Sequence, residues 1–371
     1  MNSNKAWTLR GIFGVAIVAA TIATPSWAQF TPPASPAYCP WPAWKLPPAQ
    51  ASDPIVYTDA HGVQYTKAQI DSAYDQACWQ QDPPDTGARS NQLSAEYVAR
   101  FGPPERYAYG PTANEGLNLY RSLDGERNAP TMIYIHGGAW RSGSASGATS
   151  MAENFVSAGA NLVSLDFINV IQSGGSLITM AEQVRAGVAW VYKNAKKLKI
   201  DPNRIYISGF SSGGHLCGVV ITTNWAARGL PSDFIQGAVC GSGMYDLYPA
   251  SLSARNLYVN FQLNDTIYKL SPINHIQNIH FPVVLSHGTK ETPEFQRQTK
   301  DFAAALKAAR KDVKLIVAEG YNHFEHNETF ANPYGPLGRA ALELMDLEPG
   351  AALRNRNGHG HGHGHGHGHH R

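Results

Sequence analysis

Two glycine-rich segments of the chain carry residues suited to acyl transfer. The first, Gly209-x-Ser211-x-Gly213, follows a β-branched stretch and precedes an apolar stretch of helical length. A tight turn from strand to helix lifts a serine hydroxyl above the sheet, next to a helix N-terminus that favours a developing anion. The motif is weak alone, and its place between a predicted strand and a predicted helix makes it more specific. We therefore predict that Ser211 is a nucleophile.

The second segment, His136-Gly-Gly-Ala-Trp140, directly follows a predicted strand. Acyl transfer needs hydrogen-bond donors aimed at the position where the oxyanion forms, and glycine-rich backbone can turn its N–H groups inward. We predict an oxyanion hole made by the amides of Gly138, Ala139 and Ser212. The alternative is a simple tight turn after the strand.

A general base is expected near the carboxyl end of the last predicted strand, where ligands bind in sheets of this kind. His323 lies there, in Gly320-Tyr-Asn-His-Phe324, and is the predicted base. His326 is the near alternative and is interpreted as a surface histidine. His136 and His215 belong to the two glycine-rich motifs, where we expect their rings to brace loops.

The acid of a Ser-His-acid triad is expected in chain order between the serine and the histidine. The loop after the strand 282–286 contains no aspartate, so Glu291 is the predicted acid. Glu294 is expected in the first turn of the next helix, where a carboxylate favours the helix dipole. Asp246, which follows an earlier strand, is the alternative acid.

The elements that position these residues alternate between short β-branched runs and longer helical stretches. Such alternation predicts an α/β fold with a mostly parallel central sheet, helices on both faces and no large separate cap, over residues 66–348. The predicted strands are 131–135, 161–167, 204–208, 236–240, 282–286 and 313–317, and the predicted helices are 180–197, 212–227, 294–307 and 336–347.

Both ends of the chain differ in composition from this domain. Residues 1–28 are typical of an export signal, with an apolar run (Gly11–Thr24) shorter than the ~20 residues of a membrane span. We expect cleavage before Gln29, a periplasmic or secreted protein and no stable membrane insertion. Residues 29–65 are a proline-rich arm. Residues 349–371 are predicted to be a disordered His-Gly tail, on which imidazoles can hold adventitious divalent metal ions.

Charge and cysteine content narrow the classes of function. The 30 Lys and Arg residues nearly balance 28 Asp and Glu residues, so nucleic-acid binding is not expected. Export permits disulfides, and we expect Cys39 to pair with Cys78, which would tie the arm to the domain. Cys217 and Cys240 lie in apolar stretches and are interpreted as small buried hydrophobes. No cysteine spacing matches a metal site, and no cofactor is predicted.

These motifs together resemble the α/β-hydrolase superfamily, within the esterase branch of kynurenine formamidase (arylformamidase) and its carboxylesterase relatives. The resemblance places the acid on Glu291, because that family commonly has an aspartate followed by a similar Pro-Glu-Phe run. Family members carry alanine where this chain has Ser212. Besides the two glycine-rich motifs, the similar segments are 70–74, 242–247, 271–272, 291–298 and 322–324.

The resemblance implies a fold for ester or amide hydrolysis, and the export signal favours an extracytoplasmic carboxylesterase acting on small-molecule or polymeric esters. Trp140 and Phe210 are predicted to contact substrate, together with Tyr245 and the loop 168–179, although core packing is an equal alternative for Tyr245. An arylformamidase-type amidase is the alternative function. A non-catalytic binding protein that uses the histidine tail is a third hypothesis.

Overall fold

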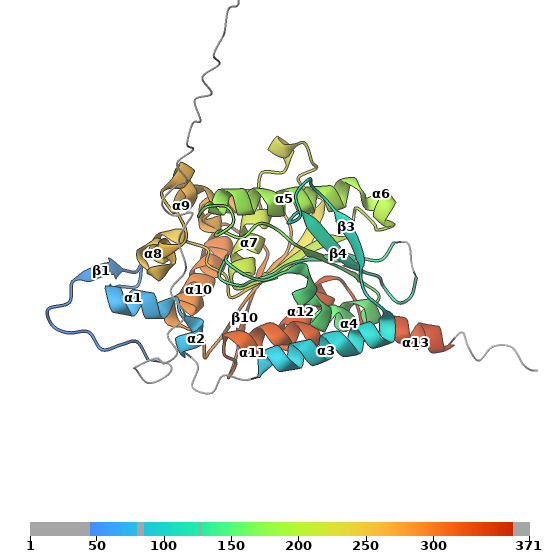
Figure 1. The fold of residues 1–371 in the computed structure, drawn as a ribbon, viewed down its shortest axis with the longest axis horizontal. Coiled ribbons are helices and arrows are strands. Elements are labelled where there is room, and N and C mark those ends of the chain that lie inside the picture. Colours follow the sequence, from blue (N-terminus) through green and yellow to red (C-terminus); the bar gives the residue numbers. More distant parts are fainter. Residues whose placement is uncertain (1–44, 80–84, 126–127, 359–371) are drawn as a thin grey trace, which may run out of the picture.

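The central feature of the fold is a twisted sheet of eight strands. The computed structural model describes residues 45–79, 85–125 and 128–358 (Figure 1). Within them the strands of this sheet lie in the order β10-β9-β8-β7-β5-β6-β4-β3. In chain order these are β3 (Glu105–Ala108), β4 (Gly116–Tyr120), β5 (Thr131–Ile135), β6 (Asn161–Leu165), β7 (Ile205–Phe210), β8 (Ile235–Gly241), β9 (Val283–Gly288) and β10 (Val313–Ala318).

The six strands from β5 to β10 all run parallel to one another and correspond to the six predicted strands. The mostly parallel α/β sheet is therefore confirmed. The sequence reading missed β4, which pairs antiparallel with β6, and β3, which pairs antiparallel with β4. Neither has a β-branched run: β4 reads GLNLY, and the edge strand β3 reads ERYA and is largely exposed.

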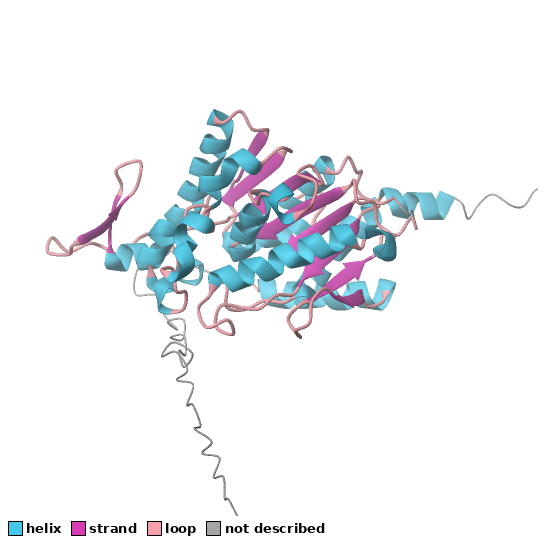
Figure 2. Ribbon diagram, turned by 90° about the horizontal axis from the view of Figure 1, so that it is seen from above, coloured by secondary structure: helices cyan, strands magenta, loops and turns pink. Residues whose placement is uncertain are grey.

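Helices cover both faces of the sheet (Figure 2). They are α1 (Lys67–Ala73), α2 (Gln76–Trp79), α3 (Thr86–Phe101), α4 (Thr149–Ala158), α5 (Leu177–Lys193), α6 (Ala195–Leu198), α7 (Ser212–Ile221), α8 (Leu247–Leu252), α9 (Thr266–Lys269), α10 (Pro293–Ala308), α11 (His323–Glu328), α12 (Pro336–Leu344) and α13 (Ala351–Gly358). The four predicted helices correspond to α5 with α6, α7, α10 and α12. The polar helix α3, with only Tyr97 buried, was not predicted.

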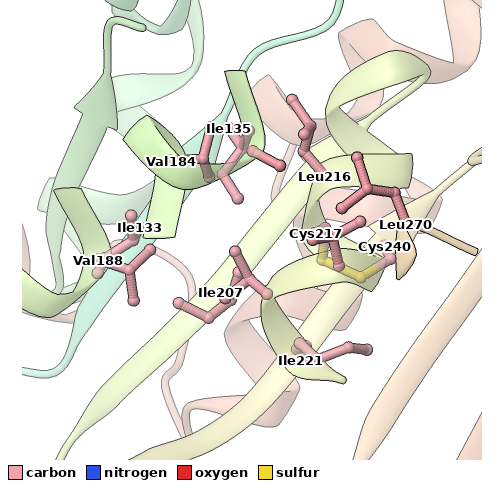
Figure 3. Packing of buried hydrophobic residues seen from close by; sticks show 14 of the residues in the cluster. Ile133, Ile135, Val184, Val188, Ile207, Leu216, Cys217, Ile221, Cys240 and Leu270 are labelled. Atoms are coloured by element: carbon pink, nitrogen blue, oxygen red, sulfur yellow. A yellow bond between two sulfur atoms is a disulfide. The ribbon is translucent and has the colours of Figure 1, made fainter. Parts of the chain in front are cut away.

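Alternating side chains along each buried strand supply two separate hydrophobic layers. In β5, Ile133 and Ile135 belong to a layer that also contains residues of α5, α7 and α10, and Figure 3 shows part of this layer. Met132 and Tyr134 face the other way and belong to a layer with residues of α3, α4 and α12. Because both faces are covered, the strand has no polar face, which is why continuous apolar runs identified the parallel strands.

A disulfide joins Cys217 of α7 to Cys240 of β8, inside the first of these layers (Figure 3). Both residues are fully buried. The interpretation of these two cysteines as separate hydrophobes is therefore wrong. Their apolar surroundings in the sequence correctly indicated burial, but their pairing depends on the packing of α7 over β8. The predicted Cys39–Cys78 pairing involves Cys39, which lies outside the described residues.

The two ends of the domain are more ordered than predicted. Within the proline-rich arm, β1 (Ile55–Thr58) and β2 (Gln64–Thr66) form a two-stranded antiparallel sheet. Within the predicted disordered tail, α13 begins at Ala351, and Ala352 is buried. The assignment of disorder is wrong for this segment, because its alanine and leucine residues favour a helix. The predicted export signal and the His-Gly repeat lie outside the described residues.

The length and hydropathy of each helix indicate whether it could span a membrane. In residues 45–79, 85–125 and 128–358, no helix combines the length and apolar character that crossing a bilayer requires.

Replacing both bridged cysteines tests the contribution of the disulfide. The bridge closes a loop with a sequence separation of 23, and a cross-link of this span stabilises by about 3 kcal/mol through restriction of the unfolded chain. We expect the double variant Cys217→Ala and Cys240→Ala to lose at least this much free energy of unfolding, measured by urea denaturation. A variant as stable as the wild type would show that the bridge contributes nothing.

Candidate active site

Ser211 lies at a sharp turn between β7 and α7. Its backbone has φ 61° and ψ −127°, which is strained for a residue with a side chain. The flanking glycines are required by space: a Cβ at Gly209 would lie 2.2 Å from the carbonyl oxygen of Gly213, and one at Gly213 would lie 2.1 Å from that of Ile135. The turn therefore has the geometry of a nucleophile elbow, as the motif predicted.

His323 meets Ser211 across the carboxyl edge of the sheet. Its Nε2 lies 2.8 Å from Ser211 Oγ. The histidine is the first residue of α11, whose N-terminus is capped by the Asn322 side chain. Phe210 and Phe295 hold the imidazole, with ring centroids 4.9 and 5.2 Å from it. The helix cap and the two rings thus fix the imidazole toward the serine.

Glu291 lies behind the imidazole and is fully buried. Its Oε2 is 3.6 Å from His323 Nδ1, and neither atom has a hydrogen-bond partner within the described parts of the chain. This separation is longer than a hydrogen bond, and catalytic contacts of this kind often tighten when substrate binds. Burial raises the pKa of Glu291, but the neighbouring imidazoles of His323 and His326 outweigh this effect, so that the pKa is lowered. The carboxylate stays ionised at neutral pH.

The second oxygen of Glu291 is held by three donors. Ser242 Oγ lies 2.6 Å from Oε1, and the Gly288 amide and His326 Nδ1 each lie 3.2 Å from it. The other nitrogen of His326, Nε2, is 2.9 Å from Ser286 Oγ. His323 and His326 are three residues apart, and residues at this spacing on a helix lie next to each other. This spacing is the feature of the sequence that could have placed both imidazoles beside one carboxylate.

His326 is therefore not a surface residue. Its side chain is completely buried beside the carboxylate, and the interpretation from sequence is wrong. The cause is that Ser242 and Ser286, which give the imidazole polar partners in the interior, lie 84 and 40 residues away in the chain.

The alternative acid, Asp246, has a different place in the structure. It caps α8 by accepting a hydrogen bond from the Tyr248 amide at 3.0 Å, and the structure does not bring it to His323. Glu294 lies in the first turn of α10, as expected, and pairs with Arg297 at 2.7 Å. Of the three acids considered, only Glu291 lies beside the imidazole.

The predicted oxyanion donors lie on the loop that follows β5 and on the elbow. Gly138 and Ala139 have positive φ values of 115° and 54°, and within the described chain their amides have no acceptor. The Ser212 amide opens α7, where the first N–H groups of a helix have no partner within it. Gly137 lets this loop approach the elbow, since a Cβ there would lie 2.8 Å from the Phe210 carbonyl oxygen.

A cavity of about 780 Å³ opens over these groups. Ser211, His323, Phe210, Gly138 and Ala139 all line it. Cavities of this size hold small-molecule ligands. The arrangement can therefore bind an ester, attack its carbonyl carbon and hold the resulting oxyanion.

Two predicted contact residues lie behind the cavity wall. Trp140 is 1% exposed, does not line the cavity, and donates its indole N–H to Nδ1 of His215 at 3.1 Å. Burial lowers the pKa of His215 to about 4, so this imidazole is neutral. Tyr245 is likewise buried in the core, where its hydroxyl donates to the Cys240 carbonyl oxygen. These aromatic residues support the site from beneath.

The fold and the site together define an α/β-hydrolase. Comparison with known proteins shows to which family of this class the chain belongs. The family model described as BD-FAE matches residues 117–306, which is more than half of the chain, and the protein belongs to this family. It is 28% identical over 245 residues to a kynurenine formamidase from Danio rerio, covering 64% of this chain and 80% of that protein.

Other similar proteins carry the name esterase. Esterase LipQ of Mycobacterium tuberculosis is 29% identical over 250 residues, covering 60% of this chain and 58% of that protein. The structure of Thermogutta terrifontis esterase 2 aligns with a TM-score of 0.57 at 22% identity, covering 67% of this chain and 97% of that one, which is a likeness of fold. The protein is accordingly a carboxylic ester hydrolase of the serine type.

Substitution of the two acids tests which one supports the histidine. We expect Glu291→Gln to lower kcat by about 10²- to 10⁴-fold, because an amide no longer stabilises the imidazolium. Asp246→Asn should leave kcat close to the wild-type value. Steady-state kinetics on 4-nitrophenyl acetate, with circular dichroism to check folding, measures both. A larger loss in the Asp246 variant would contradict the assignment.

Replacing His326 tests whether it positions Glu291. We expect His326→Leu to lower kcat by about 10- to 100-fold with KM little changed, because a displaced carboxylate misorients the base. His326→Asn retains an N–H donor near the position of Nδ1 and should recover part of the loss. Equal kcat values in both variants, with equal loss of stability, would show a role in packing alone.

Proposed function

We propose that this protein is an extracytoplasmic carboxylesterase in which Ser211, His323 and Glu291 form the catalytic triad. The observation that carries the proposal is the 2.8 Å contact between Ser211 Oγ and His323 Nε2, on a strained turn and at the floor of a cavity. The buried, ionised Glu291 behind the imidazole supports it.

In the first half-reaction, Ser211 Oγ bonds to the ester carbonyl carbon while its proton passes to His323 Nε2. The carbonyl oxygen becomes an oxyanion, which the amides of Gly138, Ala139 and Ser212 stabilise. The bond to the alcohol oxygen then breaks, and the proton on Nε2 moves to that oxygen. An acyl-enzyme and a free alcohol result.

In the second half-reaction, water replaces the alcohol. His323 takes a proton from the water, whose oxygen bonds to the acyl carbon, and the same three amides hold the second oxyanion. The bond to Ser211 Oγ breaks and the serine recovers its proton, which releases the carboxylic acid. Glu291 stays ionised throughout and stabilises the transient imidazolium.

The location outside the cytoplasm is part of the proposal. Residues 1–28 supply an export signal, and the Cys217–Cys240 disulfide fits an oxidising compartment.

Amide hydrolysis of the arylformamidase type is the second candidate. It uses the same groups, with a nitrogen leaving group protonated by His323, and the similarity to a kynurenine formamidase favours it. Parallel assays on phenyl acetate and on formanilide separate the two, because the carboxylesterase proposal requires the larger kcat/KM for the ester.

Removing the Ser211 hydroxyl tests the proposed nucleophile. We expect Ser211→Ala to lower kcat on 4-nitrophenyl acetate by at least about 10⁴-fold, the scale seen when a triad serine is removed. Ser212→Ala is the matched control: it also removes one hydroxyl at the elbow but keeps the backbone amide, so kcat should stay near the wild-type value. Wild-type turnover by Ser211→Ala would end the proposal.

A further inference from the structure

An arginine in the wall of the cavity has an unsatisfied donor. Arg255, in the 3-10 helix Ala254–Leu257, is 8% exposed and lines the same cavity as Ser211. Its two terminal nitrogens donate to the Tyr258 hydroxyl at 2.9 Å and to the Tyr74 carbonyl oxygen at 3.0 Å. Its Nε is buried and has no hydrogen-bond partner within the described chain. A buried donor without a partner is costly, so the guanidinium is not fully satisfied by the protein.

The positive charge of Arg255 is also without a counter-charge. In the described parts of the chain, no ion pair within 4.0 Å involves this residue. The acids that line the cavity have other partners: Asp71 pairs with Lys67, Asp75 accepts from the Cys78 amide, and Glu328 pairs with Arg89. His215, the nearby imidazole, is neutral. A buried cation without a counter-ion favours the binding of an anion in the cavity.

Aromatic rings orient the guanidinium without consuming its donors. Its central carbon lies 5.3 Å from the centroid of Trp140 and 5.9 Å from that of Tyr74. Cation–π contacts at these distances stabilise the charge and limit the movement of the side chain. Arg255 is therefore fixed before any ligand arrives, which lowers the cost of binding.

A second arginine extends this positive wall. Arg141 directly follows Trp140 on the loop that carries Gly138 and Ala139, and it also lines the cavity. Its guanidinium carbon lies 5.0 Å from the centroid of Tyr258, whose hydroxyl accepts from Arg255. The two cations thus flank one tyrosine, and one of them is on the oxyanion loop itself.

We propose that Arg255, assisted by Arg141, forms a subsite for a free carboxylate group of the substrate. The preferred substrates are esters that carry an anionic carboxylate apart from the scissile bond, in the acyl or the alcohol portion. This inference rests on the proposed function, because it places the carboxylate relative to the attack by Ser211. A guanidinium offers planar donors that match a carboxylate.

Matched ester pairs test the subsite. For the alcohol portion, 4-acetoxybenzoate is compared with 4-acetoxybenzamide, which is neutral and has a single ester bond. For the acyl portion, the mono-4-nitrophenyl ester of adipic acid is compared with 4-nitrophenyl hexanoate. We expect the wild type to have the higher kcat/KM for the anionic member of at least one pair, and that pair identifies the portion that carries the carboxylate.

Substitution of the arginine should reverse this preference. In Arg255→Gln, the ratio of kcat/KM for the anionic ester to that for the neutral ester should fall by about 10- to 100-fold, as expected for a lost charged hydrogen bond. Arg141→Gln should give a smaller fall. Arg339→Gln is the matched control, because it removes an exposed cation paired with Glu343, and neither residue lines the cavity. Its ratio should equal that of the wild type.

A competition assay keeps the proposal falsifiable if Arg255→Gln does not fold. With the wild type, 4-hydroxybenzoate should inhibit hydrolysis of the neutral esters more strongly than 4-hydroxybenzamide. Equal inhibition, or wild-type ratios near one for both ester pairs, overturns the subsite while leaving esterase activity intact. Absence of hydrolysis of every ester would instead refute the proposed function.

Discussion

The backbone of Ser211 is the constraint on which the rest of the site depends. Its left-handed φ costs about 1–3 kcal/mol, and the surrounding structure must hold it. Gly137, Gly209 and Gly213 allow this, because at these positions the oxyanion loop, β7 and α7 approach one another more closely than a Cβ would permit. Behind the turn, α7 is joined to β8 by a buried disulfide. The strained residue is thus held by a buried helix and strand, so the serine hydroxyl stays directed at His323.

One carboxylate between two imidazoles organises the other half of the site. A glutamate side chain is longer and has more freedom than an aspartate, so it needs more anchors to keep one oxygen toward the base. Ser242, the Gly288 amide and His326 supply them on Oε1, which leaves Oε2 for His323. The longer side chain is therefore matched by a buried polar network around Oε1.

The sequence was sufficient to predict those elements and residues whose local pattern agrees with their place in the tertiary structure. Strands such as Thr131–Ile135 are buried on both faces, so their apolar runs were readable, and the elbow around Ser211 needs its glycines locally. It was insufficient where partners are distant in the chain. The burial of His326 depends on Ser242 and Ser286, which lie far from it in the chain. The Cys217–Cys240 pairing depends on the packing of α7 over β8. Contacts of this kind follow from the assembled sheet, and no local propensity encodes them.

Trp140 shows how a motif can be functional without touching substrate. The sequence suggested that its ring contacts the ester, but the ring lies one layer behind the cavity, fixed by its bond to His215. From there it supports the guanidinium of Arg255, while the residues on either side, Ala139 and Arg141, reach the cavity. The short segment from His136 to Arg141 therefore combines oxyanion donors, an aromatic support and a cation. A loop that must already be rigid for catalysis can hold a charge near the substrate at little additional entropic cost, and so chemistry and substrate recognition share one rigid element.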